Sequence, residues 1–139
     1  MEYLSKSDKE TQRIAKDFAK TLKSGEVIGL IGDLGAGKTT FTQGLAKALG
    51  IKQNITSPTF VLMKVYPVKH PTIKHFCHID AYRLKSYADL EAIGATEYVN
   101  AHDCVTVVEW AGRVKKILPK THQIITLNNL DGLRIINIK

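Results

Sequence analysis

A glycine-rich segment that ends in a lysine and a threonine is the strongest chemical signal in the sequence. Residues 32–39 read GDLGAGKT, which matches the pattern GxxxxGK[ST] at every fixed position. Glycines let backbone N–H groups approach phosphate oxygens, and the start of the following helix adds its positive dipole end. Lys38 then reaches the β- and γ-phosphates, while the Thr39 hydroxyl is a ligand for Mg²⁺. The segment therefore predicts a nucleotide-binding site.

The sequence favours ATP over GTP at this site. Ras-like GTPases usually read the base with an NKxD motif, and the chain has no such motif. Asn128, Asn129 and Asp131 lie in a plausible loop but do not reproduce it. We therefore predict ATP as the nucleotide.

Two carboxylates follow apolar runs that read as buried strands. Asp80 comes after residues 75–79, and Glu109 comes after residues 105–108. The carboxyl ends of parallel strands face the ligand crevice, so both side chains can face the phosphates. One would hold Mg²⁺ and the other would orient the attacking water, but the sequence leaves these two roles unassigned. His78 shares a face with Asp80, yet no third ligand is evident, and we predict no zinc site.

A hydroxyl-bearing segment follows the predicted phosphate-loop helix. Residues 57–60 read SPTF, and Thr59 stands where switch loops place a hydroxyl near the γ-phosphate. Composition alone favours the simpler interpretation, a strand that begins at a proline.

Alternating helices and strands must position these residues. Ser7 and Glu10 have the spacing of a capping box, and the apolar residues that follow recur at helical spacing until Gly25. The remaining expected elements are strands at 27–31, 59–66, 74–79, 105–108, 123–127 and 134–138, and helices at 39–49, 87–100 with a break near Gly94, and 110–118. Asp131-Gly132 predicts a C-terminal β-hairpin. The alternation predicts one α/β domain over residues 1–139.

Composition narrows the class of protein. The 139 residues carry a net charge of +7, which attracts phosphate, but the lysines form no dense run and do not by themselves indicate RNA binding. No apolar run is long enough to cross a membrane, and the first residues lack a signal sequence, so we expect a cytoplasmic protein without membrane contact. Cys77 and Cys104 are expected to be reduced, buried thiols.

Several motifs in one order resemble the TsaE family. They are GDLGAGKTT at 32–40, SPTF at 57–60, HIDAYRL at 78–84 and VEW at 108–110. The phosphate loop is shared with many families, whereas the other three motifs discriminate. The resemblance spans nearly the whole chain. It implies a P-loop fold with a mainly parallel sheet, and an ATPase that hydrolyses slowly and is stimulated by partners.

The resemblance also implies partners and residue roles. The partners would be the TsaB and TsaD proteins, which form threonylcarbamoyladenosine at position 37 of ANN-decoding tRNAs, so that this chain would meet tRNA only through the complex. The implied roles are phosphate binding for Gly35, Ala36, Gly37, Lys38, Thr39 and Thr40; Mg²⁺ binding for Thr39 and Glu109; a place near the metal and γ-phosphate for Asp80; and contacts with adenine and ribose for Thr11 and Arg134. Thr59 would act as the switch residue, Trp110 would flank the nucleotide or the partner surface, and Tyr82 and Arg83 would report the nucleotide state to the partner.

Two other functions compete with the ATPase. A small-molecule kinase would need lid arginines around the transferred phosphoryl group, but the four arginines are well separated and no lid-length insertion is present. A nucleotide-dependent regulator that does not hydrolyse ATP is the second alternative. Stimulation of hydrolysis by TsaB and TsaD separates it from the ATPase.

Overall fold

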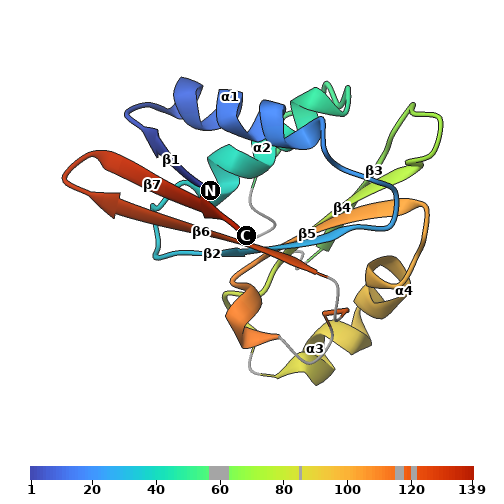
Figure 1. Ribbon diagram of the computed structural model, residues 1–139. Coiled ribbons are helices and arrows are strands. Elements are labelled where there is room, and N and C mark those ends of the chain that lie inside the picture. The colour runs from blue at the N-terminus through green and yellow to red at the C-terminus, as the bar shows by residue number, and fades with distance from the viewer. Residues whose placement is uncertain (57–62, 85, 115–117, 120–121) are drawn as a thin grey trace.

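Seven strands form one sheet with a parallel centre and antiparallel margins (Figure 1). The structure, a computed structural model, describes residues 1–56, 63–84, 86–114, 118–119 and 122–139. Its strands are β1 (Glu2–Ser5), β2 (Val27–Ile31), β3 (Met63–Pro67), β4 (His75–Asp80), β5 (Cys104–Glu109), β6 (Gln123–Leu130) and β7 (Leu133–Ile138). They lie in the order β1-β7-β6-β2-β5-β4-β3. The strands β6, β2, β5 and β4 are parallel to one another, which confirms the expected α/β fold.

Two helix layers cover the two faces of this sheet (Figure 1). The helices α1 (Asp8–Ala19) and α2 (Lys38–Ala48) lie on one face, and α3 (Tyr87–Ala92) and α4 (Ala95–Val99) lie on the other. Successive strand residues point to opposite faces, so each strand contributes to both layers. On the first face Ile28 and Val107 pack with Phe18 and Phe41, and on the second face Ile79 packs with its own group of buried side chains around α3 and α4.

The two helices of the first layer approach each other closely at Gly44 of α2. A Cβ atom at this position would lie 2.7 Å from both the Cβ of Ala15 and the backbone oxygen of Gln12 in α1. Because these neighbours are backbone or the first atom of a side chain, they have little freedom to move away. The absence of a side chain at Gly44 therefore sets the spacing of α1 and α2.

Most predicted elements are confirmed, and two expectations need correction. The predicted break near Gly94 separates α3 from α4, and Asp131 and Gly132 form the tight turn between β6 and β7 with φ of 51° and 85°. The predicted helix at 110–118 is wrong at its start: Trp110 has a left-handed φ of 61°, and a short 3₁₀ turn, η1 (Ala111–Arg113), follows. Ala111 packs against Gly29 of β2, which holds the chain on the sheet instead of releasing it into a helix.

The second correction is a strand that the sequence did not reveal. The edge strand β1 pairs antiparallel with β7, and its four residues are too few and too polar to show an alternating pattern. Of the strand predicted at 59–66, residues 63–66 belong to β3, while residues 59–62 and the SPTF segment lie outside the described part of the chain.

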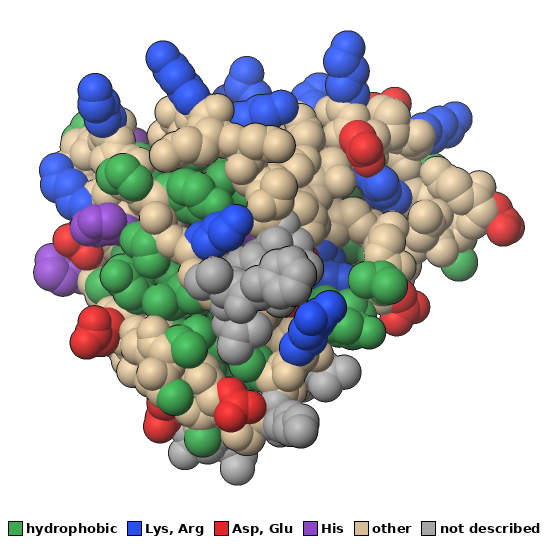
Figure 2. Space-filling view, turned by 180° about the vertical axis from the view of Figure 1, so that it is seen from behind, with side chains coloured by type: hydrophobic (Ala, Val, Ile, Leu, Met, Phe, Trp, Pro, Cys, Tyr) green, Lys and Arg blue, Asp and Glu red, His purple; other side chains and the backbone are tan. Residues whose placement is uncertain are grey.

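Charge is unevenly spread over the surface. Figure 2 shows Lys and Arg side chains gathered along the side of the molecule where α1 and α2 lie. The outer face of α1 exposes Lys9, Arg13, Lys16 and Lys20 opposite its buried residues. Across the described ranges, no helix has the length and apolar character that crossing a membrane requires.

Candidate functional site

The phosphate loop joins β2 to α2 and depends on two glycines with left-handed backbone angles. Gly35 has a φ of 80° and Gly37 a φ of 104°, angles at which a residue with a side chain is strained. Gly37 is also crowded, because a Cβ there would lie 3.1 Å from Nε of Arg134. Lys38 then begins α2, so the positive end of the helix points into the loop.

Lys38 lies at the centre of the loop and is only 5% exposed, which is unusual for a lysine. Its Nζ donates hydrogen bonds to the backbone oxygens of Gly32 at 2.6 Å and Asp33 at 2.9 Å. Burial lowers the pKa of Lys38, and the nearby carboxylates of Glu109 and Asp80 oppose this shift. The loop therefore places the ammonium group of Lys38 close to two carboxylates.

The two predicted carboxylates are neighbours across the sheet. In the parallel pairing of β4 with β5, Asp80 lies opposite Glu109. Glu109 is 3% exposed, and its Oε1 and Oε2 lie 3.2 Å and 3.4 Å from the Thr39 hydroxyl, which donates to them. Oδ1 of Asp80 accepts a hydrogen bond of 2.9 Å from the backbone N–H of Tyr82. The strand ends thus bring both carboxylates to the start of α2, as predicted.

An aromatic pair covers Lys38 on its other side. The Nζ atom lies 3.9 Å from the centroid of the Trp110 ring, a distance at which a cation is attracted to the ring face. The Trp110 ring in turn contacts the Tyr82 ring, with centroids 4.8 Å apart. The left-handed backbone of Trp110, directly after Glu109, turns its indole back over the loop.

Arg134 of β7 reaches the opposite side of the loop. Its NH1 donates to Oδ1 of Asp8 at 2.7 Å and to the hydroxyl of Thr11 at 3.0 Å. The Thr11 hydroxyl is fully buried and also contacts the Ser5 hydroxyl at 2.7 Å. These contacts fix the guanidinium group beside Gly37.

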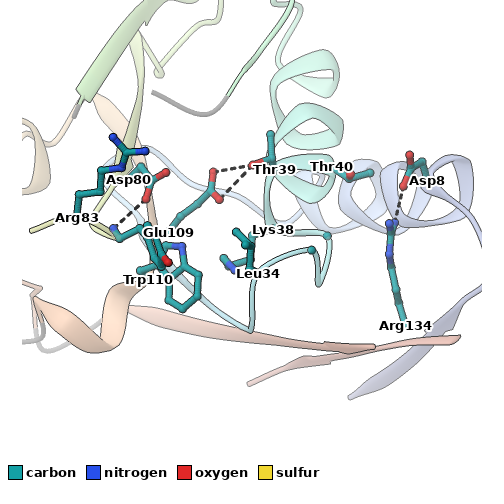
Figure 3. Close-up of a pocket in the computed structure, with 13 residues that line it drawn as sticks. Asp8, Leu34, Lys38, Thr39, Thr40, Asp80, Arg83, Glu109, Trp110 and Arg134 are labelled. Atoms are coloured by element: carbon teal, nitrogen blue, oxygen red, sulfur yellow. Dashed lines mark hydrogen bonds and ion pairs between the residues drawn. The ribbon is translucent and has the colours of Figure 1, made fainter. Parts of the chain in front are cut away.

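These groups line one cavity of about 500 Å³, a volume typical of small-ligand sites. Figure 3 shows Asp80, Arg83, Glu109 and Trp110 toward one end, Asp8 and Arg134 at the other, and Lys38, Leu34 and Thr39 between them. The complete lining consists of Asp8, Leu34, Gly35, Gly37, Lys38, Thr39, Thr40, Asp80, Tyr82, Arg83, Glu109, Trp110 and Arg134.

Most of the predicted site residues therefore meet in one place. Thr11 and Ala36 do not belong to the lining, and Thr11 is connected to the cavity through its hydrogen bond from Arg134. Thr59 lies outside the described residues. Two lining residues were not predicted: Leu34 occupies a variable position of the motif, and Asp8 reaches the cavity only because α1 starts beside β7. No local pattern marks either of them.

The donor atoms at the carboxylate end suit Mg²⁺. The Thr39 hydroxyl, Glu109 and Asp80 offer oxygen atoms, the ligands that Mg²⁺ prefers. Within the described ranges, no group of three His, Cys, Asp or Glu side chains is arranged to hold a metal ion by itself. A cation here would complete its coordination with water and phosphate oxygens, as Mg²⁺ does in nucleotide sites.

Known proteins resemble this chain over nearly its whole length. The family model described as "Threonylcarbamoyl adenosine biosynthesis protein TsaE" matches residues 5–135. A protein of Treponema pallidum named "tRNA threonylcarbamoyladenosine biosynthesis protein TsaE" is 42% identical over 139 residues, which cover 99% of each chain. A protein of the same name from Rickettsia bellii is 39% identical and covers 95% of this chain and 90% of its own.

A solved structure agrees with the sequence relatives. The crystal structure of YdiB from Bacillus subtilis superimposes with a TM-score of 0.80 at 34% identity, covering 99% of this chain and 83% of that chain. The family match, the P-loop fold and the relatives' identities converge on one conclusion: the chain belongs to the TsaE family.

Proposed function

We propose that the chain binds ATP with Mg²⁺, hydrolyses it slowly, and acts on a complex of the TsaB and TsaD proteins in threonylcarbamoyladenosine modification of tRNA. One observation carries the proposal: Lys38 of an intact phosphate loop shares a cavity with Thr39, Asp80 and Glu109. The names of the relatives support the pathway, since they describe proteins of tRNA threonylcarbamoyladenosine biosynthesis.

The two ends of the cavity suggest how the nucleotide lies. The β- and γ-phosphates would rest on the loop beside Lys38 and Thr39, near the carboxylates (Figure 3). Thr40 lies between the loop and Arg134, a position that suits the α-phosphate. The base and ribose would then extend toward Arg134, with Thr11 acting indirectly by fixing the guanidinium group.

We assign separate tasks to the residues at the phosphate end. Mg²⁺, if bound, would supply positive charge that offsets the negative charge of the phosphate oxygens. Glu109 would join Thr39 in holding the cation, because its carboxylate already contacts the Thr39 hydroxyl. Asp80 would orient water for attack on the γ-phosphorus, which breaks the bond to the bridging oxygen and yields ADP and inorganic phosphate. Lys38 would stabilise the negative charge of the phosphates throughout.

The mouth of the cavity offers a surface that a partner can cover. Leu34 is 80% exposed and Tyr82 is 42% exposed, and both line the cavity that holds Lys38. Trp110 links Tyr82 to Lys38, so a change at the phosphates would reach the surface through these two rings. Arg83 lines the same side, and Thr59 stays a predicted sensor of the γ-phosphate.

ATP hydrolysis by the purified chain, alone and mixed with TsaB and TsaD, tests the proposal. We expect the chain alone to hydrolyse ATP slowly and the rate to rise clearly when TsaB and TsaD are added. Lys38→Ala should lose both the basal rate and the stimulation. The matched control is Lys47→Ala, because Lys47 is an exposed lysine of the same helix. Tight ATP binding and a demonstrated complex without any rise would favour a regulator that does not hydrolyse ATP. Phosphoryl transfer to a metabolite would favour a kinase.

A further inference from the structure

A buried histidine outside the cavity lining contacts one of the proposed Mg²⁺ ligands. His78 of β4 has a fully buried side chain, and its Nε2 forms a hydrogen bond with Oε2 of Glu109. Its other ring nitrogen, Nδ1, is buried without a hydrogen-bond partner in the part of the chain that the structure describes. Burying a polar nitrogen without a hydrogen bond costs free energy, so the position of this ring calls for an explanation.

The strand register explains how His78 reaches Glu109. His78 lies opposite Val107 and Asp80 lies opposite Glu109 in the parallel pairing of β4 and β5. Residues two apart on a strand share a face, so His78 and Glu109 are diagonal neighbours on the face that α2 covers. The imidazole ring spans this diagonal, and both partners come from central strands of the sheet.

The chemistry of the pair fixes the direction of the hydrogen bond. An ionised carboxylate only accepts hydrogen bonds, so Nε2–H of His78 donates to Glu109. Oε2 is occupied by His78 in this way, whereas Oε1 is the oxygen nearer to the Thr39 hydroxyl, at 3.2 Å. The Glu109 carboxylate thus has two side-chain donors, one from β4 and one from the first turn of α2.

The two donors differ in what holds them. Thr39 lies in the first turn of α2, directly after the loop that receives the phosphates, so its hydroxyl must adjust to the ligand. His78 is fixed inside the sheet and does not line the cavity. The orientation of Glu109 therefore depends on His78 whether or not a nucleotide is bound.

We infer that His78 is a positioning residue that holds the Glu109 carboxylate in the orientation needed for Mg²⁺-dependent nucleotide binding. This inference rests on the proposed Mg²⁺ and nucleotide site. Side chains that hydrogen-bond a metal-binding carboxylate fix its direction, and their loss typically weakens metal binding about 10- to 100-fold. His78 contributes to the cation end of the cavity without touching the nucleotide.

The test compares ADP affinity measured calorimetrically in Mg²⁺ and in EDTA. Mg²⁺ is expected to raise the ADP affinity of the wild-type protein. We expect this gain in affinity to be about tenfold smaller in His78→Ala, while the affinity in EDTA stays near that of the wild-type protein. His78→Gln retains an N–H group at the reach of Nε2, so it should keep most of the gain. His78→Asn is also polar, but its N–H group stops short of Glu109, so it should behave like His78→Ala.

Val107→Ala is the matched control for lost packing. Val107 is the register partner of His78, is fully buried, and points to the same helix layer. Its truncation should lower thermal stability and leave the Mg²⁺ gain unchanged. If only His78→Gln and His78→Asn fold, their difference in Mg²⁺ gain still decides the matter.

Three results would overturn the inference: an unchanged Mg²⁺ gain in His78→Ala, equal behaviour of the Gln and Asn variants, or the same loss of gain in Val107→Ala. If the ADP affinity of the wild-type protein is the same in Mg²⁺ and in EDTA, the proposed metal site is wrong, and this inference is wrong with it. The first set of results leaves the proposed function standing, so the two failures are distinguishable.

Discussion

The ammonium group of Lys38 lies against the face of Trp110, 3.9 Å from the ring centroid, while it donates to two backbone oxygens of its own loop. Phosphate oxygens carry full negative charge and compete strongly for the same ammonium group. The phosphates of the proposed nucleotide would therefore compete with these contacts for the ammonium group, and the ring of Trp110 lies directly beside that group.

Trp110 is the single tryptophan of the chain, so tryptophan emission reports on this ring alone. We expect ADP or ATP to change the emission in a saturable way, because the Lys38 ammonium group, which lies over the Trp110 ring, would move toward the phosphates. Lys38→Ala should weaken nucleotide binding roughly 10- to 100-fold, the range expected for a lost hydrogen bond to a charged group. A fluorescence titration with a calorimetric check measures both effects. Calorimetric binding to the unchanged protein without any change in emission would contradict the first expectation.

Isosteric changes of the two carboxylates should separate their roles. Glu109→Gln is expected to lower the affinity for the nucleotide in Mg²⁺ but not in EDTA, because Glu109 contacts Thr39 at the cation end. Asp80→Asn is expected to retain binding and to lose about 100-fold in partner-stimulated turnover, the lower range for a positioned proton acceptor. Binding titrations and phosphate release measured on the same samples give the comparison. Interchanged effects would reverse the assignment of the two residues.

Arg134→Lys probes the other end of the cavity. Lysine keeps the charge but not the planar guanidinium group, whose NH1 contacts both Asp8 and Thr11, so the group beside Gly37 loses its fixed position. We expect nucleotide affinity to fall about fivefold, which corresponds to roughly 1 kcal/mol. The free energy of unfolding should change by less than about 1 kcal/mol, because Asp8 is exposed and such ion pairs contribute little.

Asp8→Asn is the control for this variant. It removes the ion pair and leaves the Arg134 side chain, so its affinity should stay closer to that of the unchanged protein. Calorimetric titration and urea unfolding of both variants separate binding from stability. If Arg134→Lys binds the nucleotide as tightly as the wild-type protein, the proposed role of Arg134 in nucleotide binding is wrong.

Gly44→Ala tests the contact between α1 and α2. Alanine normally stabilises a helix relative to glycine by about 1 kcal/mol. Here the new Cβ would lie 2.7 Å from the backbone oxygen of Gln12, so we expect a loss of roughly 1–3 kcal/mol in the free energy of unfolding. Urea denaturation measures it. Gly112→Ala is the control, since among the described residues, its two chain neighbours aside, no atom lies within 4 Å of its added Cβ. A stabilised Gly44→Ala protein would show that the helices can separate at little cost.

The parts of the molecule that follow local patterns were predictable from the sequence. The phosphate loop, the strand before it and the helix after it are one continuous segment, and the structure confirms all three. Asp80 and Glu109 each end an apolar run, and the parallel arrangement of the central strands follows from the alternation of elements. The sequence therefore indicated that both could face the phosphate loop, and the structure places both in the cavity that Lys38 and Thr39 line.

The parts that depend on register or on distant pairing were not predictable. The hydrogen bond from His78 to Glu109 requires β4 and β5 to pair in one particular register. The strand β1 forms because β7 presents an edge to it, not because its own four residues favour a strand. Trp110 follows a strand in a region that reads as helical, and its left-handed backbone comes from packing around Ala111 and Gly29.

The contact between Arg134 and Gly37 has a consequence for how the motif could be transplanted. A segment from Val27 to Ala48 contains the whole of GDLGAGKT with its strand and its helix, yet it lacks the wall that Arg134 builds beside Gly37. Grafted onto another scaffold, such a segment would carry an anion-binding loop open on the side that faces the base. Discrimination among nucleotides would then depend on side chains at the margin of the sheet and not on the loop alone.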